Sequence, residues 1–531
     1  MRPFLYLETL RYLKPVQIWN QVRYRTRTVI RKLTGFSYKF EVECNASHLN
    51  FQRWIAKPES VKKGRFQFLN QEKQMLHGIN WNDTGHGLLW AYHLNYMDFI
   101  LQETMTKKDG LAFINEFIHS TGSNPIGIAP YPTSLRGINW IKFLSHHHIA
   151  EARINHSLFA QYLILNDTIE YHLYGNHLLE NGFSLLFAAL YFRHEVFYRK
   201  AKKILLKELE EQVLKDGGHF EQSPMYQLIM LDRMLDCLNL LIHNKVFPDQ
   251  DELIDILKVK ISFMLGWVNE LSYSDGTLPM FNDSTEGMAP RVAQISEYAD
   301  RLQVAVRTVK LRESGFRCYN TALYQIRITM GSIMAPYIPG HSHADTFSFD
   351  LMVHDKPLIV DTGISTYEKN QRRQYERGTS AHNTVQFRDI DSSLVWGGFR
   401  MGRRAFVSRY KETGISYEAT HSGYSRFGVR HERGFHFKGD SVRIADSFIG
   451  KKGFEGIARF HFHPDVDPVV KGGKVRFSGG QMQFDKADHV SSSPSSYAAG
   501  YNQLIKSNVI EVLFHNRLNT VLTFDKLIRE K

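Results

Sequence analysis

The chain has 531 residues, of which 43% are hydrophobic and 23% charged. This length is too great for one ordinary core, and the composition is that of a folded protein, so we expect at least two globular domains. Lys and Arg exceed Asp and Glu by 66 − 54 = 12. Such a charge attracts nucleic acid, an anionic membrane or an acidic polysaccharide, unless it is only an uneven surface charge. Nucleic acid is excluded as a partner, because the sequence carries no long basic tract or RNA-binding signature.

Residues 1–50 are expected to form a basic helical segment apart from the main domains. Five basic residues lie close together there, at Arg23, Arg25, Arg27, Arg31 and Lys32. Charged residues interrupt every apolar run, so the pattern predicts neither a secretory signal nor a membrane span. Peripheral contact with an anionic membrane fits the segment, although a solvated helix or a brace against the main domain is favoured. We therefore predict a cytoplasmic location, with the inner face of the membrane as a variant of it.

A helical domain is predicted for residues 51–315. The segments 184–215, 226–247 and 251–272 carry apolar residues at three- and four-residue spacing, and turn residues such as DGGH and PDQD separate them. Helices of similar length with short links predict helical hairpins packed side by side.

An antiparallel β domain is predicted for residues 316–531. Beyond residue 315 the apolar period falls to two, as in 321–337, 347–363 and 510–526. Short links such as KGD at 438–440 are typical of hairpins. Strands in this number make a sandwich or a barrel.

The clearest chemical signal is GHSHADTFSFDL at 340–351. His341 and His343 alternate there, so both side chains can point to one face. Asp361 ends a later apolar strand, and His382 leads into another. Imidazoles and a carboxylate brought together by a sheet make a divalent metal site, most easily zinc. Taken singly, each histidine is more often an ordinary core or surface residue.

Further polar candidates lie at helix starts and loops of the helical half. Loops at one end of a helical toroid converge on one cleft, so these side chains can meet there. Asn176 has a plain alternative role as a helix N-cap, and Tyr226 as a packing aromatic. The candidates are Arg136 and Asn139 after a proline-rich stretch, Asn176, His177 and Glu180 at one helix start, His219, Glu221 and Tyr226 at another, and Asn282 in the loop 274–284.

Seven segments, in this order, resemble the heparinase II/III family: NPIGIAPYPTSLRGINWIKFL, GNHLLENG, DGGHFEQSPMYQLIMLDRMLD, DGTLPMFNDS, GHSHADTFSFDL, PLIVDTGISTYE and AHNTV. The likeness runs from residue 85 to 465. It implies an incomplete (α/α) toroid followed by an antiparallel β-sandwich, in agreement with the periodicity. It also implies cleavage of uronate-containing glycans by β-elimination.

The resemblance assigns roles to individual residues. By resemblance, Asn176 corresponds to the residue that binds the uronate carboxylate, Tyr226 to the catalytic tyrosine, His341 to the catalytic histidine, and His343, Asp361 and His382 to a structural metal site.

Uronate chemistry needs these residue types. The C5 proton is weakly acidic because the neighbouring carboxylate is already negative, so donors such as Asn176 and Arg136 stabilise the enolate-like intermediate. Tyr226 or His341 then removes the proton, and an acid protonates the departing O4. A tyrosine base requires a cationic neighbourhood. The candidate for it is QRRQYERG at 371–378, with Arg372, Arg373 and Arg377, and a solvated loop is its alternative.

The substrate and even the reaction class stay open at this point. The opening LRYLKPVQIWNQVRYR looks like relatives found with bacterial surface-polysaccharide assembly, which makes an endogenous envelope glycan the expected substrate. One alternative is a non-catalytic glycan-binding or assembly protein. The other is a glycoside hydrolase that uses two carboxylates out of Glu180, Asp216, Glu221, Asp275 and Asp283.

Overall fold

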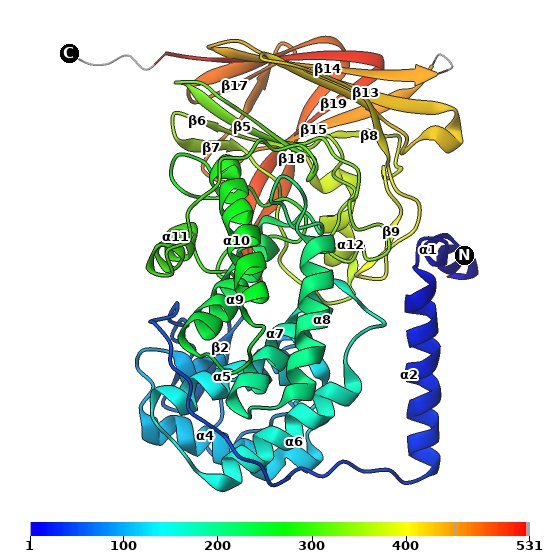
Figure 1. The fold of residues 1–531 in the computed structure, drawn as a ribbon. Helices are drawn as coiled ribbons and strands as arrows, with labels where there is room; N and C mark the ends of the chain where they lie inside the picture. The colour runs from blue at the N-terminus through cyan, green and yellow to red at the C-terminus, as the bar shows by residue number, and fades with distance from the viewer. Residues whose placement is uncertain (1, 451–452, 527–531) are drawn as a thin grey trace, which may run out of the picture.

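The computed structural model describes residues 2–450 and 453–526, and it stacks a β domain on a helical domain (Figure 1). A small antiparallel sheet opens the helical domain, with strands β1 (Val61–Lys62), β2 (Arg65–Phe68) and β3 (Gln71–Gln74). The helices that follow are α3 (Leu88–Tyr96), α4 (Lys107–Ser120), α5 (Pro130–His146), α6 (Ala152–Thr168), α7 (Gly175–Tyr191), α8 (Glu195–Gln212), α9 (Pro224–His243), α10 (Asp251–Leu271) and α11 (Val292–Arg301).

Helix α7 lies at the centre of the helical domain. It is buried on almost every side and packs against α5, α8 and α9. Gly182 permits the close approach of α8, because a Cβ atom there would lie 2.8 Å from a side-chain carbon of Ile204. A helix that is apolar all round belongs inside a domain, so the sequence of α7 fixes it at the core.

The β domain contains two main antiparallel sheets. The smaller has the order β4 (Phe316–Asn320), β5 (Tyr324–Thr329), β6 (Phe349–Val353), β7 (Lys356–Ile359). The larger has the path β11 (Val407–Thr413), β12 (Ser416–His421), β13 (Val429–Phe437), β14 (Ser441–Gly450), β19 (Gln503–Phe524), β18 (Gly480–Gly500), β17 (Lys474–Phe477), β16 (Val469–Lys471), and β15 (Glu455–His461) joins β19 to β8 (Val385–Phe387).

Alternation of buried and exposed residues forms the core between these sheets. Along β14, for example, Val442, Ile444 and Phe448 are buried, and the residues of the opposite face, such as Arg443 and Ser447, are more exposed. Their side chains join one apolar cluster with residues of the smaller sheet, such as Ile326 and Phe349. The architecture is therefore an incomplete (α/α) toroid followed by an antiparallel β-sandwich, and the fold predicted from the sequence is confirmed.

Two N-terminal helices brace the outside of both domains (Figure 1). Helix α1 (Arg2–Leu10) lies beside the short hairpin of β9 (Val395–Trp396) and β10 (Arg400–Met401), where Trp396 Nε1 donates to Thr9 Oγ1 at 3.2 Å. Helix α2 (Pro15–Leu33) runs along the helical domain. Within residues 2–450 and 453–526, no helix combines the length and the apolar character that crossing a bilayer requires.

Candidate active site

Tyr226 and His341 meet where the toroid joins the sandwich. Tyr226 lies in the first turn of α9, and its backbone N–H donates to Oγ of the N-cap residue Ser223. His341 comes from the loop between β5 and β6, and the two ring centroids lie 4.0 Å apart. The Ser-Pro helix start thus fixes the tyrosine in place beside an imidazole from the other domain.

Two carboxylates flank the His341 ring. Its Nδ1 lies 2.8 Å from Asp283 Oδ2, and its Nε2 lies 3.4 Å from Glu221 Oε2. With Nδ1 protonated towards Asp283, the ring is oriented and Nε2 becomes the nitrogen that exchanges a proton. Glu221 Oε2 is buried and has no hydrogen-bond partner among the described residues, so it faces the Nε2 side of the ring without another polar contact.

Asp283 is the fixed negative charge beneath the site. Arg373, from α12 (Gln371–Arg377), donates to both carboxylate oxygens, at 2.5 and 2.7 Å. His343 Nε2 lies 2.7 Å from Oδ1. Burial alone raises the pKa of this carboxyl, but the Arg373 cation and the hydrogen bonds from both histidines hold the pKa of Asp283 well below its usual range. The Asp283 carboxylate therefore stays ionised.

The first turn of α7 faces Glu221. The Asn176 N–H donates to Glu221 Oε1 at 3.0 Å, while Glu221 Oε2 faces His341. Gly175 has a φ of +59°, and a Cβ atom there would lie 2.6 Å from Glu221 Oε1. Glu221 thus links Asn176 to His341, as the sequence-based assignment of Asn176 and His341 to one site requires.

An aromatic wall that the sequence analysis missed adjoins Tyr226. The hydroxyl oxygens of Tyr226 and Tyr367 lie 3.3 Å apart, and Tyr367 contacts Phe399 and Tyr501 edge to face. Burial raises the pKa of Tyr226 well above its ordinary value, and nearby groups such as Asp283 add to the effect. The phenol is therefore protonated at neutral pH. Tyr501 follows β18 and Tyr367 lies in a loop, and no local pattern marks either as a partner of Tyr226.

Arg136 and Asn139 are core residues, and the prediction that they bind substrate is wrong. The Arg136 side chain is fully buried, donates to Gln161 Oε1 at 2.9 Å and to the Asn95 carbonyl at 3.0 Å, and lies over the Phe117 ring. The Asn139 amide donates to the Tyr96 carbonyl. Their motif is proline-rich and polar because it holds α5 to α3.

His177 and Glu180 differ in accessibility. His177 Nδ1 lies 3.1 Å from Glu170 Oε1, its ring packs near Tyr131, and its side chain is 33% exposed. Glu180 is fully buried, 3.4 Å from Arg233 Nε, and burial raises its pKa to about 7. Only His177 can reach a ligand without rearrangement.

Three further predicted residues are buried behind the site: His219, Asn282 and Arg377. His219 is buried, its Nε2 lies 3.1 Å from Gln212 Oε1, and burial lowers its pKa to about 4. Asn282 accepts from the His343 N–H at 2.9 Å. Arg377 donates to the carbonyls of Ser342 and Gly398, and so holds the His341 loop. Of the arginines in the predicted basic stretch 371–378, Arg373 pairs with Asp283, whereas Arg377 binds backbone carbonyls.

The carboxylates proposed for hydrolysis either lie apart from the site or already contact other groups. Asp216 accepts from the backbone N–H groups of Arg312 and Ser314, and Asp275 caps an exposed turn. Glu221 and Asp283 flank His341.

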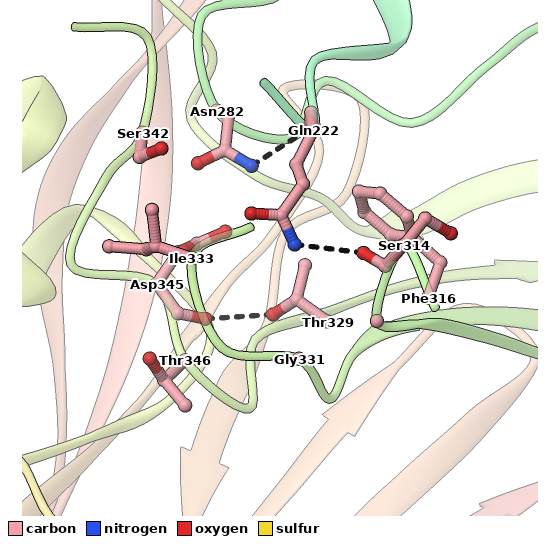
Figure 2. Close-up of a pocket in the computed structure, with 11 residues that line it drawn as sticks. Gln222, Asn282, Ser314, Phe316, Thr329, Gly331, Ile333, Ser342, Asp345 and Thr346 are labelled. Carbon is pink, nitrogen blue, oxygen red and sulfur yellow. Dashed lines mark hydrogen bonds between the residues drawn. The ribbon is translucent and has the colours of Figure 1, made fainter. Parts of the chain in front are cut away.

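A small polar cavity lies behind this site (Figure 2). Its volume is about 20 Å³, and its lining includes Gln222, Asn282, Thr329 and Asp345. The Gln222 amide donates to the Ser314 carbonyl (Figure 2) and, across the domain junction, to the Ser332 carbonyl. Such a volume suits one water molecule and is far too small for a sugar, so this cavity belongs to the packing of the junction.

The predicted metal ligands lie next to the Tyr226–His341 pair, since His343 and His341 both contact Asp283. His382 Nδ1 lies 2.7 Å from Asp361 Oδ2, and the rings of His343 and His382 are 5.3 Å apart. Among the described residues, no three His, Cys, Asp or Glu side chains are arranged as a metal cage. However, His343 Nδ1, His382 Nε2 and Asp345 Oδ2 are buried without a hydrogen-bond partner. Two imidazoles, each held by a carboxylate at its other nitrogen, fit zinc by their chemistry.

Comparison with known proteins extends these observations. Residues 141–304 match the Heparinase II/III N-terminus, and residues 305–525 match the Heparinase II/III-like C-terminal domain. The chain is 24% identical to a heparin-sulfate lyase of Bacteroides stercoris over 246 residues, which are 40% of this chain and 36% of that relative.

Solved structures show the same fold. Heparinase III has a TM-score of 0.65 at 16% identity, with 86% of this chain and 80% of that one covered. Heparan sulfate lyase HepC of Pedobacter heparinus has a TM-score of 0.55 at 16% identity, covering 87% and 82%. The chondroitin AC lyase of Streptomyces coelicolor A3 has a TM-score of 0.52 at 9% identity, covering 84% and 75%. With both of its domains matched, the chain belongs to the heparinase II/III family.

Proposed function

We propose that this protein is a polysaccharide lyase that cleaves a uronate-containing glycan by β-elimination. The observation that carries the proposal is the Tyr226–His341 pair, 4.0 Å apart between their ring centroids, with the imidazole held by Asp283. Relatives of the chain support the proposal, since they include lyases of heparin sulfate, heparan sulfate and chondroitin.

The surroundings of the pair suggest how the two residues divide the proton transfers. Tyr226 is protonated in the free protein, so it is assigned as the acid that protonates the departing O4. His341 Nε2, with Nδ1 held by Asp283, is assigned as the base that removes the C5 proton. The C5–H electrons form the C4=C5 double bond as the C4–O4 bond breaks, and each proton transfer contributes roughly 10²–10⁴-fold. Solvent then returns a proton to Tyr226 and takes one from His341.

Asn176 is assigned to the uronate carboxylate. It lies in the first turn of α7, where the partial positive charge of the helix N-terminus favours an anion. Its backbone is fixed by Glu221, so its amide is placed relative to His341 before substrate arrives. This assignment replaces the Asn176–Arg136 pair that the sequence suggested.

The first test is absorbance of a newly formed unsaturated uronate with a panel of acidic glycans. Tyr226→Phe should lower the elimination rate by about 10²–10⁴-fold with an unchanged melting temperature. Tyr375→Phe, on α12 and outside the aromatic wall, is the matched control. In D₂O, Tyr226→Phe should still exchange the C5 proton of the substrate, whereas His341→Ala should not.

The outcomes separate the alternatives. Loss of C5 exchange in Tyr226→Phe would reverse the assignment of acid and base. Shortened chains without new absorbance would establish hydrolysis, and unchanged chains with measurable binding would establish a glycan-binding protein. The panel should include bacterial surface polysaccharides, because a role in their metabolism is the setting that the N-terminal resemblance suggests.

We further propose that His343, Asp361 and His382 contribute to a structural zinc site. The proposal is supported by the buried, unpartnered nitrogens of the two histidines and by Asp361 behind His382. Asp345, with a free buried oxygen, is an additional candidate ligand. When bound, the metal would tie β-domain loops together and take no part in proton transfer.

Metal content and thermal stability test this site without reference to activity. Purified protein should carry about one zinc per chain, and chelation should lower its melting temperature. His382→Ala should lose the metal, while His489→Ala, at an exposed position of β18, should keep it. Metal-free protein that melts at the same temperature with and without added zinc would refute the proposal.

A further inference from the structure

Helix α2 uses one of its faces to contact the rest of the protein. Gln17 is buried against the Leu173 and Tyr337 carbonyls, Tyr24 stacks on His172, and Arg27 and Arg31 pair with Asp167. These positions recur on one side of the helix. The opposite side is therefore turned away from both domains.

That opposite side carries an apolar stripe, interrupted at Thr26. Residues 18, 22, 29 and 33 recur at helical spacing, with 19 and 30 beside them. The exposed fractions are 45% for Ile18, 66% for Trp19, 53% for Val22, 57% for Val29, 53% for Ile30 and 81% for Leu33. Helix α1 adds exposed apolar side chains at Phe4, Leu7 and Leu10. Single exposed apolar residues are ordinary, but a stripe along a whole helix marks an interaction surface.

Basic residues border the stripe. Helix α2 contains no Asp or Glu. Arg27 and Arg31 are paired with Asp167, whereas Arg23, Arg25 and Lys32 form no ion pair among the described residues. On the helix, Arg25 and Lys32 lie along one border of the stripe and Arg23 along the other. The surface therefore combines an apolar centre with positive edges.

We propose that α2, with α1, docks the protein on the surface of an anionic lipid bilayer. An amphipathic helix of this kind lies in the interface plane, with its apolar face among the acyl chains, its basic residues near anionic headgroups and its tryptophan at the boundary. A second copy of the chain is a poorer occupant, because the basic borders of two such stripes repel each other. The inference does not depend on the reaction that the protein catalyses.

Docking in this way would orient the whole protein. Helix α1 is fixed to the sandwich through Trp396 and through the Arg403–Glu8 ion pair. Helix α2 is fixed to the toroid through Asp167. Since the two helices brace both domains, the bilayer would hold the active site at a set height and direction.

Vesicle co-sedimentation of the full chain tests the proposal. The wild-type protein should bind vesicles of phosphatidylcholine with phosphatidylglycerol, and binding should weaken with added salt. A double variant Trp19→Glu, Val22→Glu should bind at least about tenfold less, because two apolar side chains no longer enter the bilayer. The triple variant Arg23→Gln, Arg25→Gln, Lys32→Gln should bind about tenfold or more weakly and lose its salt dependence.

The control keeps the experiment independent of folding. Ile415→Glu places the same charge at a 64% exposed residue of the β11–β12 turn and should bind vesicles like wild type. Equal melting temperatures establish that all variants are folded. The proposal would be overturned if the wild-type protein did not bind anionic vesicles, or if the double variant bound them as strongly as wild type. A dimer that the double variant dissociates, without any lipid binding, would assign the stripe to self-association.

Discussion

Three buried arginines show how the surroundings of a side chain decide its role. Arg373 faces the Asp283 carboxylate, and this charge raises its pKa above the ordinary value. Arg136 and Arg377 are surrounded by carbonyls and neutral groups, and burial lowers the pKa of each to about 9. The first therefore supports a charged site, and the other two hold chain segments together. Sequence cannot separate them, because each partner lies far away along the chain.

At the same scale, His219 and Glu180 should give opposite pH dependences of stability. Burial lowers the pKa of His219 to about 4, so the unfolded chain binds the extra proton below about pH 6.5 and stability falls as the pH falls towards 4. Burial raises the pKa of Glu180 to about 7, so the folded protein holds the extra proton and stability falls as the pH rises from about 4.5 to 7.

Denaturant unfolding at pH 5 and pH 7.5 measures both effects. The difference in unfolding free energy, pH 7.5 minus pH 5, should shrink by about 2 kcal/mol in His219→Gln and grow by about 2 kcal/mol in Glu180→Gln. Glu195→Gln, at the exposed start of α8, should leave the difference unchanged. If this difference changed in the same direction in both variants, the opposite pKa shifts of His219 and Glu180 would be contradicted.

At the scale of elements, the first turn of α7 contributes to the candidate site, whereas the interior of the helix contributes to the core. The helix is apolar and its place in the core follows from composition, but its first turn carries Asn176 towards Glu221. That approach depends on Gly175, whose φ of +59° and missing Cβ leave room for the carboxylate. A glycine at this point therefore serves the site as well as the turn.

Gly175→Ala should accordingly impair both stability and activity. The left-handed backbone alone costs about 1–2 kcal/mol with any β-carbon. The new methyl would also displace Glu221, so the elimination rate should fall by tenfold or more with the substrate panel. Gly276→Ala is the matched control, because Gly276 has a φ of +79° and open space around it. Gly276→Ala should lose stability by the same cost of the left-handed backbone and keep its elimination rate. Equal elimination rates in the two variants would contradict the role of Gly175 in the site.

At the scale of the whole molecule, periodicity was sufficient for the two fold classes and insufficient for the site. The change from helical spacing to alternation near residue 315 predicts a helical domain and then an antiparallel β domain, because core burial imposes both periods. The toroid and the sandwich as such were implied by the resemblance. The motif residues Asn176, Tyr226 and His341 are brought together as the resemblance implied. Arg373 belongs to the basic stretch that the sequence offered for the cationic field. Tyr367 could not be assigned to the site, because only the docking of the two domains brings it beside Tyr226.

That docking rests in part on Arg327, and its removal should uncouple the domains. From β5, Arg327 donates to the Leu271 and Ser272 carbonyls, at the C-terminal end of α10. Arg327→Met would leave these carbonyls unpaired and lower the unfolding free energy by about 2–4 kcal/mol. We expect scanning calorimetry to show one transition for wild type and two for the variant, as the toroid and the sandwich melt separately. Arg443→Met, at an exposed position of β14, should retain one transition, and a single transition in Arg327→Met would place the coupling elsewhere in the junction.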